Sequence, residues 1–190
     1  MEDFDFAGRQ GVDGLVGAAA ELIDQWNITG DQAAFVECIP RADRIAYDRI
    51  VDLVPRAAFV PFTDLWWRGL PARAGQTWIS TRFHLHLLAA VAGASGVALS
   101  GRRDYYPAKH RSLIDSGSHW QHIESSDLPH EPAHGGGFTS DAVTRLRDRK
   151  NDLAASIYPP DPVTSSRVAR PLLRLRRVRN SAEHPAQPRG

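Results

Sequence analysis

Residues 77–100, TWISTRFHLHLLAAVAGASGVALS, decide the fold that this sequence predicts. The short apolar runs at 77–80 and 96–100 are typical of buried strands, and residues 82–94 between them form a Leu- and Ala-rich segment of helical length. Two strands joined by a helix predict a right-handed crossover between parallel neighbours in one sheet. The turn at 80–82 is then the carboxyl end of a strand that leads directly into a helix.

The same alternation extends toward the N-terminus. Apolar spacing and short apolar runs predict, in chain order, a helix, a strand, a helix and a strand: 14–26, 33–39, 42–54 and 57–61. The second of these helices has an expected buried face of Ile45, Ile50, Leu53 and Val54. A short helix is expected next, with Thr63 or Asp64 as its cap. Because strands and helices alternate, the sequence predicts a three-layer, Rossmann-like α/β domain with a parallel sheet covered on both faces.

Beyond residue 100 the sequence predicts fewer regular elements. Residues 124–137 are expected to form a loop, since they contain two prolines, three consecutive glycines and few apolar side chains. Residues 101–111 are expected to form the loop that follows the strand at 96–100. Thr139 is expected to cap a helix at 140–157. The expected buried face of that helix is Val143, Leu146, Leu153 and Ile157.

Composition is typical of one globular domain. The chain has 190 residues, of which 42% are hydrophobic and 24% charged, which is enough for one sizeable core. We expect that domain over residues 1–158 and a disordered tail rich in Arg and Pro over residues 159–190. A net charge of +1 gives no sign of a nucleic-acid partner, and none is expected. The acidic N-terminus and the absence of a long apolar run predict a cytoplasmic protein without a transmembrane segment.

Neither a disulfide nor a metal site is expected. Cys38 is the only cysteine, which excludes an intramolecular disulfide and a Cys-rich zinc site. His119 and His122 are three residues apart, whereas a helical zinc pair is spaced i, i+4. No Gly-x-Gly-x-x-Gly, Walker or Gly-x-Ser-x-Gly motif is present.

Basic side chains gather where the strand at 77–80 passes into its helix. Ligands of open parallel sheets bind beyond the carboxyl ends of the strands, where helix N-termini offer N–H groups and positive dipole ends. The guanidinium of Arg82 suits a carboxylate or phosphate, and His86 lies four residues further along the same helix face. The candidate binding residues at this turn are Ser80, Thr81, Arg82, Phe83, His84 and His86.

A second group of candidates follows the strand at 96–100. The segment after this strand contributes Arg103, Tyr105, Lys109 and His110. Neighbouring parallel strands lie about 4.8 Å apart, so the two groups are expected to face one cleft and to bind a small, multiply charged anion. The alternative for each residue taken singly is an ordinary solvated surface.

The stretch at 77–100, followed by DYYPAKHRSL at 104–113, resembles the C-terminal, donor-binding domain of polysaccharide pyruvyl transferases. The family pattern is a strand, an Arg-Leu-His-like motif, a Leu- and Ala-rich helix, a strand and a Lys-bearing loop, and the likeness covers residues 35–120. It implies one half of a GT-B-type architecture with two Rossmann-like domains. It also implies transfer of the pyruvyl group of phosphoenolpyruvate to a sugar of a cell-surface glycan in exopolysaccharide biosynthesis, with phosphoenolpyruvate as donor substrate and no further cofactor.

The resemblance also implies roles for individual residues. Arg82 and His84 match the family's Arg and His that hold phosphoenolpyruvate, and Phe83 stands where the family more often has Leu. Arg82 is expected to clamp the anion and His84 to act as general acid or phosphate contact, with Lys109 and Arg103 in support.

The likeness does not include an acceptor-binding domain or the leading strand of the donor-binding domain. We therefore expect a partial enzyme, whose glycan or lipid-linked sugar acceptor is recognised by an N-terminal domain or a second chain. Two alternatives are a nucleotide-sugar-dependent GT-B glycosyltransferase half and a catalytically inactive interaction module.

Overall fold

The computed structural model describes residues 5–6, 9–10, 12–101, 106–124, 127–132 and 134–158. The candidate residues Arg103 and Tyr105 and the expected tail at 159–190 lie outside these described residues. The chain divides into two units, Met1–Arg149 and Lys150–Gly190. The strands and the cores described below belong to the first unit.

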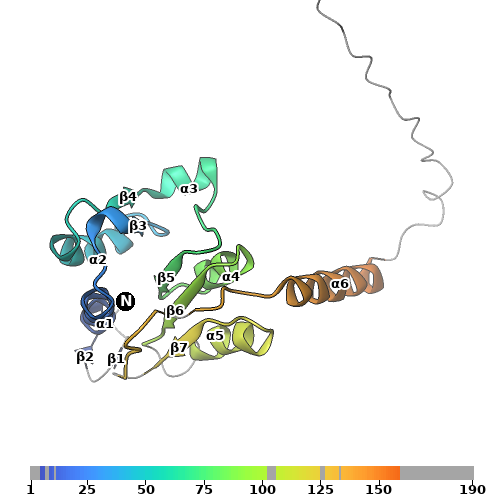
Figure 1. Ribbon diagram of the computed structural model, residues 1–190. Helices are drawn as coiled ribbons and strands as arrows, with labels where there is room; N and C mark the ends of the chain where they lie inside the picture. The colour runs from blue at the N-terminus through green and yellow to red at the C-terminus, as the bar shows by residue number, and fades with distance from the viewer. Residues whose placement is uncertain are drawn as a thin grey trace, which may run out of the picture. The chain divides into compact units, whose positions relative to one another are not determined.

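The first unit contains a three-stranded parallel sheet (Figure 1). Its strands are, in hydrogen-bonded order, β5 (Thr77–Ser80), β6 (Ser95–Leu99) and β7 (Gln121–Ile123). The crossovers between them are α4 (Phe83–Val91) and α5 (Tyr106–Asp115). Trp78 pairs with Gly96 in parallel register. The strand, helix and strand predicted over residues 77–100 are therefore confirmed.

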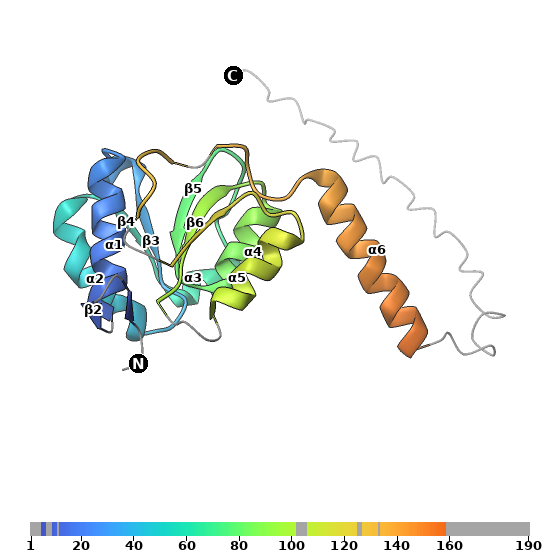
Figure 2. The same ribbon diagram turned by 90° about the horizontal axis from the view of Figure 1, so that it is seen from below.

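Helices cover both faces of this sheet, and Figure 2 shows α4 and α5 on one side of β5 and β6 with α1 (Val12–Gln25) on the other. The core on the first side consists of residues from α4, α5, β6 and the chain after them: Ala89, Ala90, Ala94, Ala98, Leu113, Trp120, Phe138 and Ala142. The core on the second side joins α1 to β6 and a loop: Ala18, Leu22, Val97, Leu99 and Leu128. The predicted three-layer α/β class with parallel strands is confirmed.

The predicted strands at 33–39 and 57–61 are confirmed as β3 (Ala34–Val36) and β4 (Ala58–Val60). They form a separate two-stranded parallel sheet, joined by α2 (Ala42–Ile50) and a 3₁₀ turn at Val51–Leu53. The Tyr47 ring packs against Phe35 and Phe59, with ring centroids 5.0 and 4.7 Å apart. The strands that were predicted to form one sheet therefore form two. The two-stranded sheet packs through aromatic rings, and the three-stranded sheet packs mainly through aliphatic side chains.

The remaining elements precede, separate or follow these strands in the sequence. An antiparallel pair of β1 (Asp5–Phe6) and β2 (Arg9–Gln10) precedes α1, a 3₁₀ turn at Gly30–Gln32 follows it, α3 (Phe62–Arg68) follows β4, and α6 (Ser140–Ile157) is the last helix described. Pro61 occupies the cap position of α3, so the predicted cap at Thr63 or Asp64 is wrong. Among the helices of the described residues, none has both the length and the apolar character needed to cross a bilayer.

Two elements of the structure, α5 and β7, were not predicted from the sequence. Lys109 and His110 belong to α5, not to a loop, and His122 lies on β7. Pro107 is the second residue of α5, a position where its missing N–H costs no intrahelical hydrogen bond. The predicted loop at 101–111 is therefore wrong for residues 106–111.

The predicted cap of α6 is confirmed, because Ala142 N donates to Thr139 Oγ1 at 3.2 Å.

Two predicted helix faces are buried only in part. Of the eight predicted face residues, Ile50 and Val54 are buried and Val143 and Leu146 pack against the core. The other four are exposed: Ile45, Leu53, Leu153 and Ile157. Apolar periodicity identifies one side of a helix, but it does not establish that another element covers the full length of that side.

We predict that Gly96→Ala destabilises the protein by about 1–3 kcal/mol, the usual cost of overpacking a core. A Cβ atom at position 96 would lie 2.7 Å from the Trp120 ring, and Gly96 itself sits in the buried strand β6. Urea unfolding followed by circular dichroism measures the change. A midpoint equal to that of the wild type would show that the strand and the indole do not approach this closely.

Candidate functional site

The three strands β5, β6 and β7 end at one edge of their sheet, which we call the carboxyl edge. Ser80 is the last residue of β5, Ser100 follows β6, and Glu124 follows β7. Because the strands are parallel, residues at their carboxyl ends gather at the same edge, where ligands of α/β sheets usually bind. Ser80 and Ser100 are each only 5% exposed, so two buried hydroxyl groups lie at this edge.

Arg82 connects the carboxyl edge to α4 and is the N-cap residue of that helix. Its backbone N–H donates to Ser80 Oγ at 3.0 Å, which fixes the turn between β5 and α4. The Arg82 side chain makes no capping hydrogen bond to α4 but extends away from it. The anion site expected at this helix start stays a prediction.

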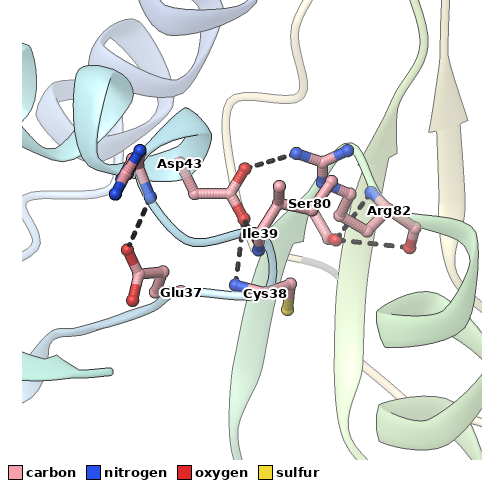
Figure 3. Close-up of polar contacts among 7 residues, drawn as sticks. Glu37, Cys38, Ile39, Asp43, Ser80 and Arg82 are labelled. Carbon is pink, nitrogen blue, oxygen red and sulfur yellow. Dashed lines mark hydrogen bonds and ion pairs between the residues drawn. The ribbon is translucent and has the colours of Figure 1, made fainter. Parts of the chain in front are cut away.

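Asp43 is the ion-pair partner of Arg82, as Figure 3 shows. Arg82 Nη2 donates to Asp43 Oδ1, and both side chains are largely buried, with exposed fractions of 33% and 21%. The other oxygen, Oδ2, accepts hydrogen bonds from the backbone N–H groups of Cys38 and Ile39, each at 2.9 Å. One carboxylate therefore joins the loop after β3 to the start of α4.

Glu37 organises the same loop from its other side. Its Oε1 accepts a hydrogen bond from Arg41 N at 3.2 Å, and its Oε2 accepts one from Phe62 N at 3.1 Å. The second bond reaches the first residue of α3. The loop after β3 is thus held to α3 by Glu37 and to α4 by Asp43.

His84 and Lys109 both lie near the ring of Phe83, the residue that follows Arg82. The His84 ring centroid is 5.4 Å from that of Phe83, and Lys109 Nζ lies 5.8 Å from the Phe83 ring centroid. His84 is exposed, while Phe83 and Lys109 are half-buried. The structure therefore places His84 and Lys109 near one aromatic ring at the start of α4, the helix whose N-cap residue is Arg82.

His86 and His110 occupy a different environment from the one expected for them. Both are 0% exposed, and their Nδ1 atoms are hydrogen-bonded to each other at 3.0 Å. His86 Nε2 is also hydrogen-bonded to Ser118 Oγ at 2.8 Å, and its ring stacks on Trp120 with centroids 4.5 Å apart. These two histidines belong to the interior of the domain and not to its surface.

Burial shifts the titration of these two imidazoles. Desolvation, with a smaller contribution from His110, lowers the pKa of His86 to about 3 from an ordinary value of 6.5. Desolvation and the neighbouring His122 lower the pKa of His110 to about 4. Both are neutral at pH 7, which suits an Nδ1-to-Nδ1 contact that has room for a single proton.

Sequence reasoning missed four polar residues that the structure brings to this region: Asp43, Ser100, His122 and Glu124. Asp43 lies 39 residues before Arg82 and Ser100 lies 22 residues before His122, so no local pattern connects the partners. Within the described ranges, no group of three or more His, Cys, Asp or Glu residues is arranged to hold a metal ion.

Comparisons with family models, with curated proteins and with solved structures found no match for this chain.

Acidification is expected to destabilise the fold through His86 and His110. In the unfolded chain these groups bind protons near pH 6.5, whereas in the folded chain they do so only near pH 3 and 4. The stability that the neutral rings provide is therefore complete above pH 6.5 and is lost as the pH falls toward 4, by up to about 1.4 kcal/mol per pH unit for each ring. Urea unfolding at pH 7, 6 and 5 measures this slope.

The matched variants for that measurement are His86→Gln and His84→Gln, which alter a buried and an exposed histidine of the same helix. The first should reduce the slope and the second should leave it unchanged. Equal slopes in both variants would assign the acid sensitivity to other groups.

Asp43→Ala is expected to destabilise the protein by about 1–3 kcal/mol, because it leaves Arg82 and two backbone N–H groups without their acceptor. The matched control is Asp48→Ala, which breaks an ion pair between half-exposed side chains in the same helix and should cost about 0.5 kcal/mol or less. Chemical denaturation of both variants tests the difference. An equal loss of unfolding free energy in the two variants would show that Asp43 contributes no more to stability than a residue of an exposed ion pair.

Proposed function

We propose that this chain is the donor-binding part of a polysaccharide pyruvyl transferase-like enzyme and binds phosphoenolpyruvate at the start of α4. The observation that carries the proposal is the position of Arg82 as the N-cap residue of α4, directly after β5, with His84 and Lys109 both near the ring of the next residue, Phe83. Phosphoenolpyruvate has a carboxylate and a phosphate on a small apolar frame. A guanidinium at the helix start and two basic side chains near an aromatic ring match that chemistry.

Arg82 is the proposed anchor for one of the two anionic groups. A guanidinium carries five N–H donors in a planar fork, so engagement of Nη2 by Asp43 leaves the side chain with further donors for a ligand. Because Asp43 already fixes the guanidinium, Arg82 loses little rotamer freedom on binding. The positive end of the α4 dipole adds to the attraction of an anion.

His84 and Lys109 are the proposed contacts for the second anionic group and for the reaction. Lys109 supplies a fixed positive charge, and His84 is an exposed imidazole able to exchange protons with a bound ligand. Ketal formation requires a proton on the methylene carbon of phosphoenolpyruvate, stabilisation of an oxocarbenium-like centre by neighbouring groups, and departure of phosphate. In this proposal His84 gives the proton or contacts the phosphate, and Arg82 and Lys109 stabilise the anionic groups.

The sugar acceptor is a further part of the proposal. Two hydroxyl groups of a glycan or lipid-linked sugar attack the same carbon of the donor in succession, so the acceptor must reach the start of α4 from solvent. The exposed position of His84 is compatible with such an approach. A further domain or a second chain would contribute the acceptor contacts.

Isothermal titration calorimetry with phosphoenolpyruvate tests the donor site. We expect saturable binding that Arg82→Ala weakens by about tenfold or more, a loss of about 1.4 kcal/mol. The matched control is Arg68→Ala, which removes a guanidinium that is 80% exposed on α3 and should leave the affinity unchanged. Circular dichroism at the titration temperature shows that each variant is folded, since Arg82 also bonds Asp43.

Equal affinity in the wild type and in Arg82→Ala would contradict the assignment of the anchor. A thermal-shift series that compares phosphoenolpyruvate with nucleotide sugars separates the two transferase classes. Stabilisation by a nucleotide sugar in preference to phosphoenolpyruvate would overturn the pyruvyl transferase proposal.

A further inference from the structure

Ser100, His122 and Glu124 contact one another in that order at the carboxyl edge. Ser100 Oγ is hydrogen-bonded to His122 Nε2, and His122 Nδ1 lies 3.2 Å from Glu124 Oε1. The hydroxyl thus meets one ring nitrogen and the carboxylate meets the other. This is the order of groups that activates a serine hydroxyl as a nucleophile.

The backbone fixes these three residues at the ends of two paired strands. β6 and β7 are parallel, with Leu99 opposite Ile123, and Ser100 N donates to Ile123 O at 3.1 Å. His122 and Glu124 are two residues apart along an extended chain, so their side chains point to the same side. The same pairing that extends the sheet therefore brings the hydroxyl, the imidazole and the carboxylate together.

The charges around His122 suit a general base. Desolvation is the largest influence on the pKa of His122 and lowers it. Glu124 raises this pKa and Arg111 lowers it, and the result lies below the ordinary value, so the ring is neutral at pH 7. Arg111 Nη2 also bonds Glu124 Oε1, which holds the carboxylate in place. The side chain of His122 is 5% exposed, and the His110 ring lies 5.5 Å away. A neutral imidazole oriented by an ionised carboxylate can accept the serine proton.

We propose that Ser100 is a nucleophile that takes an acyl group from a small carboxylic ester, with His122 as its general base and Glu124 as the positioning residue. Ser100 Oγ attacks the carbonyl carbon while its proton moves to His122 Nε2. The bond to the leaving alkoxide then breaks, and His122 returns the proton to it as an alcohol forms. Water, deprotonated by His122, hydrolyses the acyl-serine to release a carboxylic acid and restore the hydroxyl.

Ser118 supplies an internal comparison. Ser118 Oγ is also hydrogen-bonded to a buried imidazole, that of His86, and Ser118 is 3% exposed, close to the 5% of Ser100. The other nitrogen of His86 contacts His110 and not a carboxylate. If burial and a histidine contact were sufficient, both serines would react. If the carboxylate is needed to orient the base, Ser100 reacts and Ser118 does not.

The test is labelling of the intact chain with a small alkyl fluorophosphonate, followed by mass spectrometry to locate the adduct. In this reaction Ser100 Oγ bonds to phosphorus, fluoride leaves, and the serine proton goes to His122. We expect the adduct on Ser100 in the wild type and no adduct in Ser100→Ala, with labelling of Ser118→Ala unchanged. Absence of the adduct from Ser100 of the wild type overturns the proposal, as does equal labelling of Ser118.

Two further variants separate catalysis from structure. His122→Gln keeps a polar side chain of similar size but cannot act as a base, and should slow labelling by about 100-fold or more. Glu124→Gln should slow it less and should leave a rate that still falls as His122 is protonated at acid pH. Labelling of folded His122→Gln at the wild-type rate would show that the imidazole does not activate Ser100. Because these measurements use neither phosphoenolpyruvate nor Arg82, their outcome is independent of the proposed donor site.

Discussion

β6 is buried along all five of its residues, and much of the first unit follows from that constraint. As the middle strand of three, it has neighbours on both edges, and its side chains alternate between two separate cores. Val97 and Leu99 require α1 on one side, while Ala98 requires α4 and α5 on the other. The small residues Gly96 and Ala98 let Trp120 and α4 approach the strand closely. Loss of either helical layer would expose half of this strand.

Burial of the sheet also determines where polar groups can exist. An imidazole without hydrogen-bond partners is costly in such an interior, so His86 is paired with both His110 and Ser118 and is stacked on Trp120. The ring nitrogens of His122 have different partners: Nε2 is hydrogen-bonded to Ser100, and Nδ1 lies close to Glu124. The first arrangement has no charged member, whereas the second ends in a carboxylate that is 35% exposed. That difference is why the two serine and histidine pairs, similar in burial, are assigned different chemistry.

The sequence predicted the structure correctly where an element is determined by the residues within it. The crossover over residues 77–100 could be predicted because strand, helix and strand periodicities follow one another without interruption. The start of α5 could not, because Pro107 is typical both of loops and of the first helical turn. His84 and His86 are two residues apart in a single helix, yet one is exposed and the other is buried. Residues two apart in a helix point to different faces, but which face is buried depends on the packing of α4 against Trp120 and α5, which are distant parts of the chain.

The ion pair of Asp43 and Arg82 is the clearest case of such a distant contribution. A lone arginine at the start of a helix is free to rotate and must be ordered by whatever it binds, at a cost of up to about 2 kcal/mol in side-chain entropy. The ion pair with Asp43 already orders the Arg82 side chain in the folded chain, so much of this entropy is lost on folding. The charge of Asp43 is balanced by two backbone N–H groups and by Arg82. The loop after β3 therefore controls the orientation of a residue at the end of β5, although the two strands belong to different sheets. A change in the packing of that loop would alter the direction in which the guanidinium points, and with it the geometry of the proposed donor site.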